Sequence, residues 1–472
     1  MSLAQPRSAK GAVVALLTLM LVRLWLASSL PLVPDESYYF LWAQHLQAGY
    51  FDHPPMVALW IKAGTMLCGN TPLGIRLLGP VFAAAGSVLL WDAAEQLAPG
   101  RGIIAVLLLN ATLMVGAGAL IMTPDTPLLF FWTAGLAALA RLITSGNPRW
   151  WLAVGLAAGG MLLSKYTAGL FIIAVFLWLL CTVSGRRVLC TPWPWVAMAL
   201  AFAIFAPNIA WNAAHGWASY MKQGGREAAF APARAAAFFA ELVAGQLALA
   251  TPGIAALAAF GVWQLRLQAS PGTRLLLWLT LVPGVVMLEH ILSDRVQENW
   301  VAIIYPSTCL AAAMLPTALL ARWLKPALAL GFGITALAYV QAADALLPLP
   351  ANLDTAGEQL SGWQNLAQDA MASHPAFITT DDYATMATLA VQGPKDVKVA
   401  GFTADWDRRW RYFGYPPAVA PGSVGVMLTK RRDTPCKDEL GTLTRHRGTE
   451  VFATYKLCRF VAPNAGVLLP RP

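Results

Sequence analysis

Two neighbouring carboxylates, Asp35 and Glu36, follow directly on the first long apolar stretch of the chain. Acidic side chains close to a bilayer are costly unless they have a partner or a task. The pair therefore has two interpretations. The carboxylates take part in acid–base chemistry at a membrane surface, or they are ordinary solvated acids in the first turn of a helix.

A second pair, Asp52 and His53, stands before two prolines in the run Gly-Tyr-Phe-Asp-His-Pro-Pro. Carboxylate and imidazole groups ligate divalent ions such as Mg, Mn or Zn. Asp52 and His53 are therefore candidate metal ligands, and a hydrogen-bonded turn is the alternative.

Lys165 interrupts an apolar run where one predicted membrane stretch ends and the next begins. An unpaired ammonium is expensive there, so Lys165 either binds an anionic group or extends its charge to the membrane surface. Asp125 stands between two prolines in Thr-Pro-Asp-Thr-Pro. That carboxylate is either functional or part of ordinary turn chemistry at the start of a helix.

The elements that position these groups follow from composition. Of 472 residues, 57% are apolar and 12% are charged, whereas soluble domains have roughly 45–50% apolar and 25% charged residues. This composition excludes a soluble enzyme, a disordered chain and a disulfide scaffold. It indicates an all-α, polytopic membrane protein.

Stretches long and apolar enough to cross a bilayer recur along the chain. Eleven are expected, and the fifth is rich in small residues that favour close helix packing. They lie near 11–30, 73–96, 102–122, 126–143, 150–164, 166–184, 193–211, 235–261, 273–292, 300–320 and 326–346.

Arginine and lysine in the short loops predict the orientation of the chain. With the N-terminus in the cytoplasm, each cytoplasmic turn is basic, the residues being Arg101, Arg141, Arg149, Arg186, Arg187, Arg266, Arg274, Arg322 and Lys325. The outer turns then carry the acids Asp35, Glu36, Asp52, Asp125, Glu227, Asp294 and Glu298. An odd number of spans places the C-terminal region outside as well.

Residues 1–346 are therefore predicted to form the membrane domain, and residues 347–472 a small α/β domain outside the membrane. The first outer loop, residues 31–70, is expected to hold two interfacial helices, one capped by Asp35 and one near 56–67. Cys436 and Cys458 both lie in the external domain. They form a disulfide or remain two free thiols.

As a set, four motifs resemble those of bacterial polyprenyl-phosphate-sugar glycosyltransferases of the GT-C fold, relatives of the aminoarabinose lipid A transferase and the protein O-mannosyltransferases. The resemblance spans roughly residues 10–345. The chain is most similar to the subgroup that has a Tyr-Phe-Asp-His-Pro-Pro signature. This subgroup includes lipopolysaccharide galacturonic acid transferases. Aminoarabinose transferases have Glu-Lys where this chain has Asp52-His53. The motifs are Asp35-Glu36, Gly49 to Pro55, Thr123 to Pro127 and Ser164-Lys165-Tyr166.

The resemblance implies direct, inverting transfer of a sugar from polyprenyl phosphate. Asp35 would act as the base toward a hydroxyl acceptor, or would orient an acceptor that is already an anionic phosphate. Lys165 would bind the departing phosphate. The other implied groups are Glu36 and Asp125 as catalytic carboxylates, Arg76, Arg295 and Tyr38 as donor contacts, and Asp52 with His53 as ligands of a divalent metal or of sugar hydroxyls.

The same resemblance implies a bacterial inner-membrane protein whose active site and C-terminal domain face the periplasm. It implies a lipid A or lipopolysaccharide acceptor, galacturonic acid or aminoarabinose as the sugar, and no nucleic acid partner. Two other classes stay open on the sequence alone. One is a secondary transporter or lipid flippase, and the other is a non-enzymatic assembly or sensor protein.

Overall fold

The computed structural model describes residues 6–225, 230–372, 374–394, 398–402, 409, 413, 415, 417–431, 433–434, 436 and 438–470. Glu227 lies outside these residues. The chain divides into two compact units. The first unit comprises Met1–Leu24, Asp52–Val57 and Leu78–Leu337, and the second comprises Trp25–Phe51, Ala58–Leu77 and Ala338–Pro472.

The expected class of a helical, multi-pass membrane protein is confirmed. Among the described residues, seven helices are long and apolar enough to cross a membrane, or eight if the bent pair Tyr166–Leu180 and Val183–Leu189 forms one span. They are Lys10–Ser29, Pro72–Leu97, Asp125–Ser145, Trp193–Ala214, Pro232–Ala250, Pro271–His290 and Thr317–Asp344.

The other stretches expected to span the membrane are helical but shorter or broken. The stretch 102–122 divides at Thr112, whose hydroxyl accepts the Val115 N–H and starts a new helix. The stretch 235–261 divides at Thr251, which has a φ of 67° and precedes Pro252. Proline and a left-handed residue both end a helix, so these breaks follow from local chemistry.

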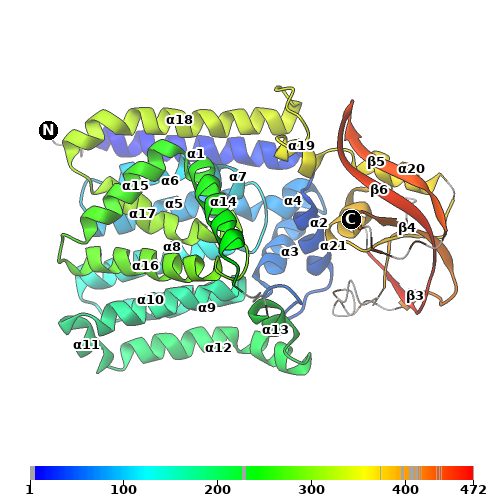
Figure 1. Ribbon diagram of the computed structural model, residues 1–472. Helices are drawn as coiled ribbons and strands as arrows, with labels where there is room; N and C mark the ends of the chain where they lie inside the picture. The colour runs from blue at the N-terminus through cyan, green and yellow to red at the C-terminus, as the bar shows by residue number, and fades with distance from the viewer. Residues whose placement is uncertain are drawn as a thin grey trace. The chain divides into compact units, whose positions relative to one another are not determined.

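The first unit is a bundle whose long helices run side by side (Figure 1). Its elements are α1(Pro6–Ser29), which continues into the second unit, α5(Leu78–Leu97), α6(Gly102–Asn110), α7(Leu113–Gly118), α8(Asp125–Ser145), α9(Trp150–Ser164), η1(Tyr166–Ala168), α10(Gly169–Leu180), α11(Val183–Leu189), α12(Trp193–Ala214), α13(Ala218–Gly224), α14(Pro232–Ala250), α15(Pro252–Leu265), α16(Pro271–His290), η2(Glu298–Ile304), α17(Tyr305–Ala313) and α18(Thr317–Asp344), which also continues into the second unit.

Small residues allow two helices of this bundle to approach closely, as the composition of the fifth stretch predicts. A Cβ at Gly155 on α9 would lie 2.6 Å from the Ala197 carbonyl oxygen on α12. A side chain at this position would therefore force the two backbones apart.

The second unit combines the first outer loop with the C-terminal region. Its helices are α2(Pro34–Gln44), α3(Met56–Cys68), which begins in the first unit, α4(Pro72–Arg76), α19(Thr355–Leu360), α20(Trp363–Met371) and α21(Tyr383–Gln392). Its strands are β1(Ile378–Thr380), β2(Ala400–Gly401), β3(Pro417–Val419), β4(Val424–Thr429), β5(Glu439–Arg447), β6(Glu450–Val461) and β7(Gly466–Leu468).

The mixed α/β character expected of the C-terminal region is confirmed. One sheet has the order β1-β4-β6-β5, with β1 parallel to β4 and the other pairs antiparallel, and the second has the order β2-β7-β3. Cys436 and Cys458 form a disulfide with a Cα–Cα distance of 5.6 Å. The alternative of two free thiols is therefore wrong.

Helix α2 begins two residues earlier than expected, and this changes the role of its acids. Pro34 occupies the first helical position after Val33, which is the N-cap. Glu36, not Asp35, therefore caps the helix, because its carboxylate accepts the Val33 N–H at 3.0 Å. Tyr39 and Trp42 on this helix, which was expected to lie at the membrane interface, are 6% and 0% exposed and pack inside the protein.

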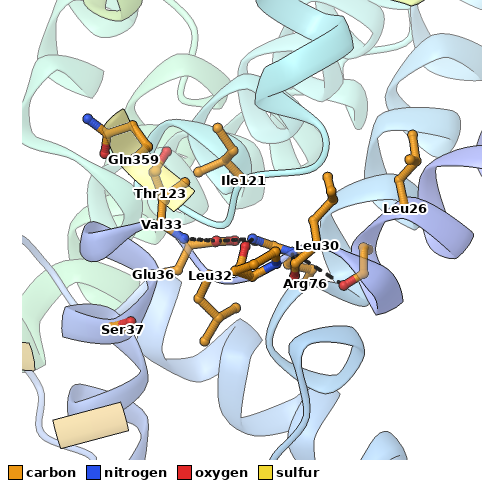
Figure 2. Close-up of polar contacts among 12 residues, drawn as sticks. Leu26, Leu30, Leu32, Val33, Glu36, Ser37, Arg76, Ile121, Thr123 and Gln359 are labelled. Atoms are coloured by element: carbon orange, nitrogen blue, oxygen red, sulfur yellow. Dashed lines mark hydrogen bonds and ion pairs between the residues drawn. The ribbon is translucent and has the colours of Figure 1, made fainter. Parts of the chain in front are cut away.

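A buried ion pair between Glu36 and Arg76 fixes the start of α2. The Arg76 Nε donates to Glu36 Oε1 at 2.7 Å, and Nη2 donates to Oε2 at 2.5 Å (Figure 2). The same guanidinium donates to the carbonyls of Leu30 and Pro31 at 2.8 and 2.7 Å. One arginine thus joins the end of α1, the start of α2 and α4, and it fixes the backbone on which Asp35 stands.

We predict that Glu36→Gln destabilises the protein strongly. The side chains of Arg76 and Glu36 are 3% and 0% exposed, so the change leaves a buried cation without its counter-charge. The expected cost in free energy of unfolding is about 3–5 kcal/mol. Thermal unfolding of the purified protein in detergent measures it.

The matched control is Asp92→Asn, which breaks the Arg141–Asp92 pair, whose side chains are 43% and 23% exposed. Exposed pairs contribute roughly 1 kcal/mol or less. If both variants lost the same small amount of unfolding free energy, the buried pair would have no structural role.

We predict that the denatured, unreduced protein has four reactive thiols and the reduced protein has six. The four free cysteines are Cys68, Cys181, Cys190 and Cys309. Counting the alkylated residues by mass spectrometry before and after reduction tests the disulfide. Six labelled thiols before reduction would show that the bond does not form in the cell.

Candidate functional site

Lys165 and Asp125 form an ion pair in the first unit. Asp125 is the first residue of α8, and Lys165 follows the last residue of α9, in an extended conformation before η1. The Lys165 Nζ donates to the two Asp125 carboxylate oxygens at 2.7 and 3.0 Å. Their side chains are 8% and 16% exposed, so Lys165 is buried and paired rather than extended to the membrane surface.

Two further residues complete this pair, and sequence reasoning missed both. Asn299 Nδ2 donates to Asp125 Oδ2 at 2.6 Å, and the Lys165 Nζ lies 5.5 Å from the centroid of the Trp300 ring. Both residues belong to η2. The only sequence signal was a polar residue beside a tryptophan in an outer loop. Asn299 orients the carboxylate, and the ring supplies a face that attracts a cation.

The element that carries Asn299 is itself held in place by polar contacts. Gln246 on α14 donates to the Glu298 carbonyl at 2.8 Å and accepts the Tyr305 hydroxyl at 2.9 Å. A Cβ at Gly245 would lie 2.3 Å from Glu298 Cγ, so this glycine lets η2 approach α14. Contacts with Gln246 and Gly245 on α14 therefore hold η2, and with it Asn299, beside Asp125.

Arg295, expected to contact the donor, lies in the loop before η2. Its guanidinium forms ion pairs with Glu241 on α14 and with Glu298, the latter at 3.2 Å, and its side chain is 43% exposed. Glu241 was not anticipated, because it stands inside a stretch read as a membrane span. Contact between Arg295 and donor phosphate stays a prediction.

A buried polar cluster adjoins Lys165 along the chain. The Tyr166 hydroxyl lies 2.7 Å from Ser219 Oγ and near Asn208 and Asn212, at 3.4 Å from each. Asn208, Asn212 and Ser219 are all 0% exposed. Sequence reasoning did not use the signal, which is a pair of asparagines one helical turn apart in an apolar stretch.

Asp35 lies in the second unit and is partly exposed. One of its carboxylate oxygens, Oδ1, accepts a hydrogen bond from the hydroxyl of Tyr383, at 3.2 Å. Tyr383 is the first residue of α21, in the C-terminal region. Sequence patterns do not indicate contact between two residues that are 348 positions apart.

Tyr38, another expected donor contact, is 1% exposed. Its ring centroid lies 5.1 Å from that of Trp42 and 4.7 Å from that of Tyr383. Donor contact by Tyr38 stays a prediction, as does phosphate contact by Arg76, whose guanidinium binds Glu36 and main-chain carbonyls.

The tyrosine of the Gly-Tyr-Phe-Asp-His-Pro-Pro run has a structural role. Tyr50 stacks on Trp42 with ring centroids 4.2 Å apart, and its hydroxyl donates to the Trp42 carbonyl at 2.9 Å. Burial raises the pKa of the Tyr50 phenol above its ordinary value. Tyr50 therefore closes the end of α2 and remains a neutral donor at physiological pH.

The expected metal ligands, Asp52 and His53, belong to the first unit. The Asp52 carbonyl accepts a hydrogen bond from Gln223 Nε2 at 2.6 Å. In the part of the chain that the structure describes, no three His, Cys, Asp or Glu side chains form a group suited to a metal ion. Asp52 and His53 alone supply two ligands, so metal binding by this pair stays a prediction.

Comparisons with known proteins agree with the resemblance seen in the motifs. Residues 52–211 match a family model described as dolichyl-phosphate-mannose-protein mannosyltransferase. The lipid A galacturonosyltransferase RgtD of Rhizobium johnstonii is 31% identical over 192 residues. That match covers 38% of this chain and 38% of the relative's length.

The fold matches along nearly the whole chain. ArnT from Cupriavidus metallidurans in the apo state superposes with a TM-score of 0.65 over 96% of this chain and 99% of that chain, at 15% identity. The same enzyme bound to undecaprenyl phosphate gives a TM-score of 0.61 at 15% identity, over 96% of this chain and 98% of that chain. The chain thus has the fold of ArnT along nearly its whole length, and its residues 52–211 are similar to the family described as dolichyl-phosphate-mannose-protein mannosyltransferase.

Proposed function

We propose that this protein is an inverting glycosyltransferase that moves a sugar from a polyprenyl phosphate to lipid A or a similar envelope glycolipid. The observation that carries the proposal is the buried Lys165 at the end of an apolar helix, which pairs with Asp125, whose carboxylate accepts a hydrogen bond from Asn299. The name of the Rhizobium relative supports a lipid A acceptor. The undecaprenyl phosphate bound to ArnT supports a polyprenyl phosphate carrier.

Lys165 binds the phosphate of the donor in this proposal. Transfer leaves negative charge on the polyprenyl phosphate, and a preorganised cation in a partly desolvated site stabilises that charge. Asp125 and Asn299 hold the ammonium in place before the donor arrives. The ion pair also keeps the empty site from containing an isolated buried cation.

Asp35 acts on the acceptor. A hydroxyl is a weak nucleophile, and a carboxylate within hydrogen-bond reach removes its proton as the bond to the anomeric carbon forms. Direct displacement inverts that carbon and forms no covalent intermediate with the protein. If the acceptor is a phosphate of lipid A, the nucleophile is already anionic, and Asp35 orients it.

We propose galacturonic acid as the first donor sugar to test, because the relative is named a galacturonosyltransferase, and aminoarabinose as the second. The protein lies in the inner membrane with the acidic outer turns and residues 347–472 in the periplasm. The Cys436–Cys458 disulfide supports an oxidising compartment for that region. Metal binding by Asp52 and His53 stays a separate prediction.

We predict that Asp35→Asn abolishes sugar transfer. The amide has nearly the shape of the carboxylate but cannot accept the proton, and loss of a general base costs about 10²–10⁴-fold in rate. The assay is transfer from a synthetic polyprenyl-phosphate galacturonic acid to lipid A, followed by mass spectrometry.

Asp294→Asn is the control for this experiment, because Asp294 is an outer-turn acid whose carboxylate accepts its neighbour's N–H. It should retain wild-type turnover. Full transfer by Asp35→Asn would remove Asp35 from the mechanism.

We predict that Lys165→Met weakens donor binding by roughly 10–100-fold, the range expected for a hydrogen bond to a charged group. Lys165→Arg keeps the cation and should lose less affinity. Lys325→Met removes an exposed lysine and should leave the affinity for the donor unchanged. The measurement is binding of the donor analogue polyprenyl phosphate to protein in nanodiscs, and unchanged binding by a folded Lys165→Met would disprove phosphate binding by this residue.

A further inference from the structure

Helix α21 of the C-terminal region lies against α2, the helix that carries Asp35 (Figure 1). Two hydrogen-bonding residues, one at each end of α21, join the helices. At its start, the Tyr383 hydroxyl donates to Asp35 Oδ1 at 3.2 Å. At its end, Gln392 Nε2 donates to the Leu32 carbonyl at 2.8 Å and to Ser37 Oγ at 3.2 Å. The two helices are therefore held in a fixed register.

The position of Tyr383 is fixed by its surroundings as well as by its helix. The Asp382 side chain caps α21, accepting the Thr385 N–H at 2.9 Å. The Tyr383 ring packs on the ring of Tyr38, with the centroids 4.7 Å apart. The Arg409 guanidinium lies 4.0 Å from the ring centroid on a face of Tyr383.

This cation changes the chemistry of the phenol. A guanidinium over an aromatic face is attracted to the ring electrons, and its positive charge polarises the O–H bond of the phenol. The hydroxyl of Tyr383 is thereby a stronger hydrogen-bond donor toward the carboxylate beside it. A hydrogen bond to the ionised form of a carboxylate stabilises that form and fixes its orientation.

We propose that Tyr383 is a positioning residue for Asp35, so that the C-terminal region takes part in the transfer reaction. The inference rests on the proposed function, because it assumes that Asp35 acts on the acceptor. Tyr383 holds one carboxylate oxygen, Oδ1, and so fixes the orientation in which the carboxylate meets the nucleophile. It also keeps Asp35 ionised, which is the form that orients or deprotonates an acceptor.

The test compares two tyrosines of the C-terminal region that donate to α2. Tyr383→Phe removes the hydroxyl that contacts Asp35, and Tyr415→Phe removes one that donates to the Leu41 carbonyl at 2.8 Å. Both variants keep their rings. Tyr415→Phe therefore controls for a general weakening of the packing between α21, its neighbours and α2.

We expect Tyr383→Phe to lower kcat by about tenfold, the equivalent of one charged hydrogen bond of modest strength, with the KM for the donor unchanged. Because the hydrogen bond stabilises the ionised carboxylate, its loss should move the acidic limb of the pH–rate profile to higher pH. Among the described residues of the second unit, Tyr38 and Arg409 also contact the Tyr383 ring. Tyr415→Phe should keep the wild-type kcat and pH profile.

Arg409→Gln provides a second variant, since it leaves the hydroxyl and ring of Tyr383 in place. Arg409→Gln should move the acidic limb of the pH–rate profile to higher pH, by less than Tyr383→Phe does. Thermal unfolding accompanies each assay.

A folded Tyr383→Phe with wild-type kcat and pH profile would overturn the proposal. Equal losses of kcat in Tyr383→Phe and Tyr415→Phe would also overturn the proposal, because they would show a structural effect only. Failure of the proposed function is distinguishable, since Asp35→Asn would then retain transfer or the wild-type protein would transfer no sugar.

Discussion

A charge removed from water must be matched by a partner, and this requirement organises the chain. The cost of leaving a buried ion unpaired is several kcal/mol. In the second unit, Arg76 meets Glu36 and two carbonyls, with hardly any exposure of either side chain. In the first unit, Lys165 meets Asp125, and Asn299 supports the carboxylate. Each pair joins segments far apart in the sequence and fixes the backbone beside it.

The two ion pairs differ in whether their cation remains available to bind a ligand. The Arg76 guanidinium binds main-chain carbonyls as well as Glu36, which suits a structural joint between α1, α2 and α4. The Lys165 ammonium has one carboxylate and one aromatic face around it. An ammonium in that setting can exchange part of its contact with Asp125 for contact with a phosphate, which a lipid-linked donor supplies. The same physical constraint therefore yields a scaffold in one unit and a candidate binding group in the other.

The sequence predicted the class of the fold because its signals are local. Apolar stretches are defined by neighbouring residues, and helices formed along them. Two cysteines in one domain left a disulfide and two free thiols as alternatives, and the structure has the disulfide. The breaks at Thr112 and Thr251 were missed, although Thr and Pro are the residue types expected at such breaks.

The site was harder to predict from the sequence than the fold, because its contacts join residues far apart in the chain. Motifs singled out Asp35, Asp125 and Lys165, but the partners Asn299 and Tyr383 lie 174 and 348 positions from the carboxylates they contact. Spacing and periodicity carry no information over such separations. The cap of α2 was assigned to Asp35 although Glu36 provides it, because the pattern admitted either residue and only the main-chain geometry decides between them.

The central claim is that this protein transfers a sugar from a polyprenyl phosphate to a lipid A-type acceptor. The most direct measurement is mass spectrometry of lipid A after incubation with the purified protein and polyprenyl-phosphate galacturonic acid, with the aminoarabinose donor in parallel. The account predicts that lipid A gains the mass of one sugar residue and that free polyprenyl phosphate appears in equal amount. Unmodified lipid A and intact donors in both reactions, with folded protein present, would contradict it.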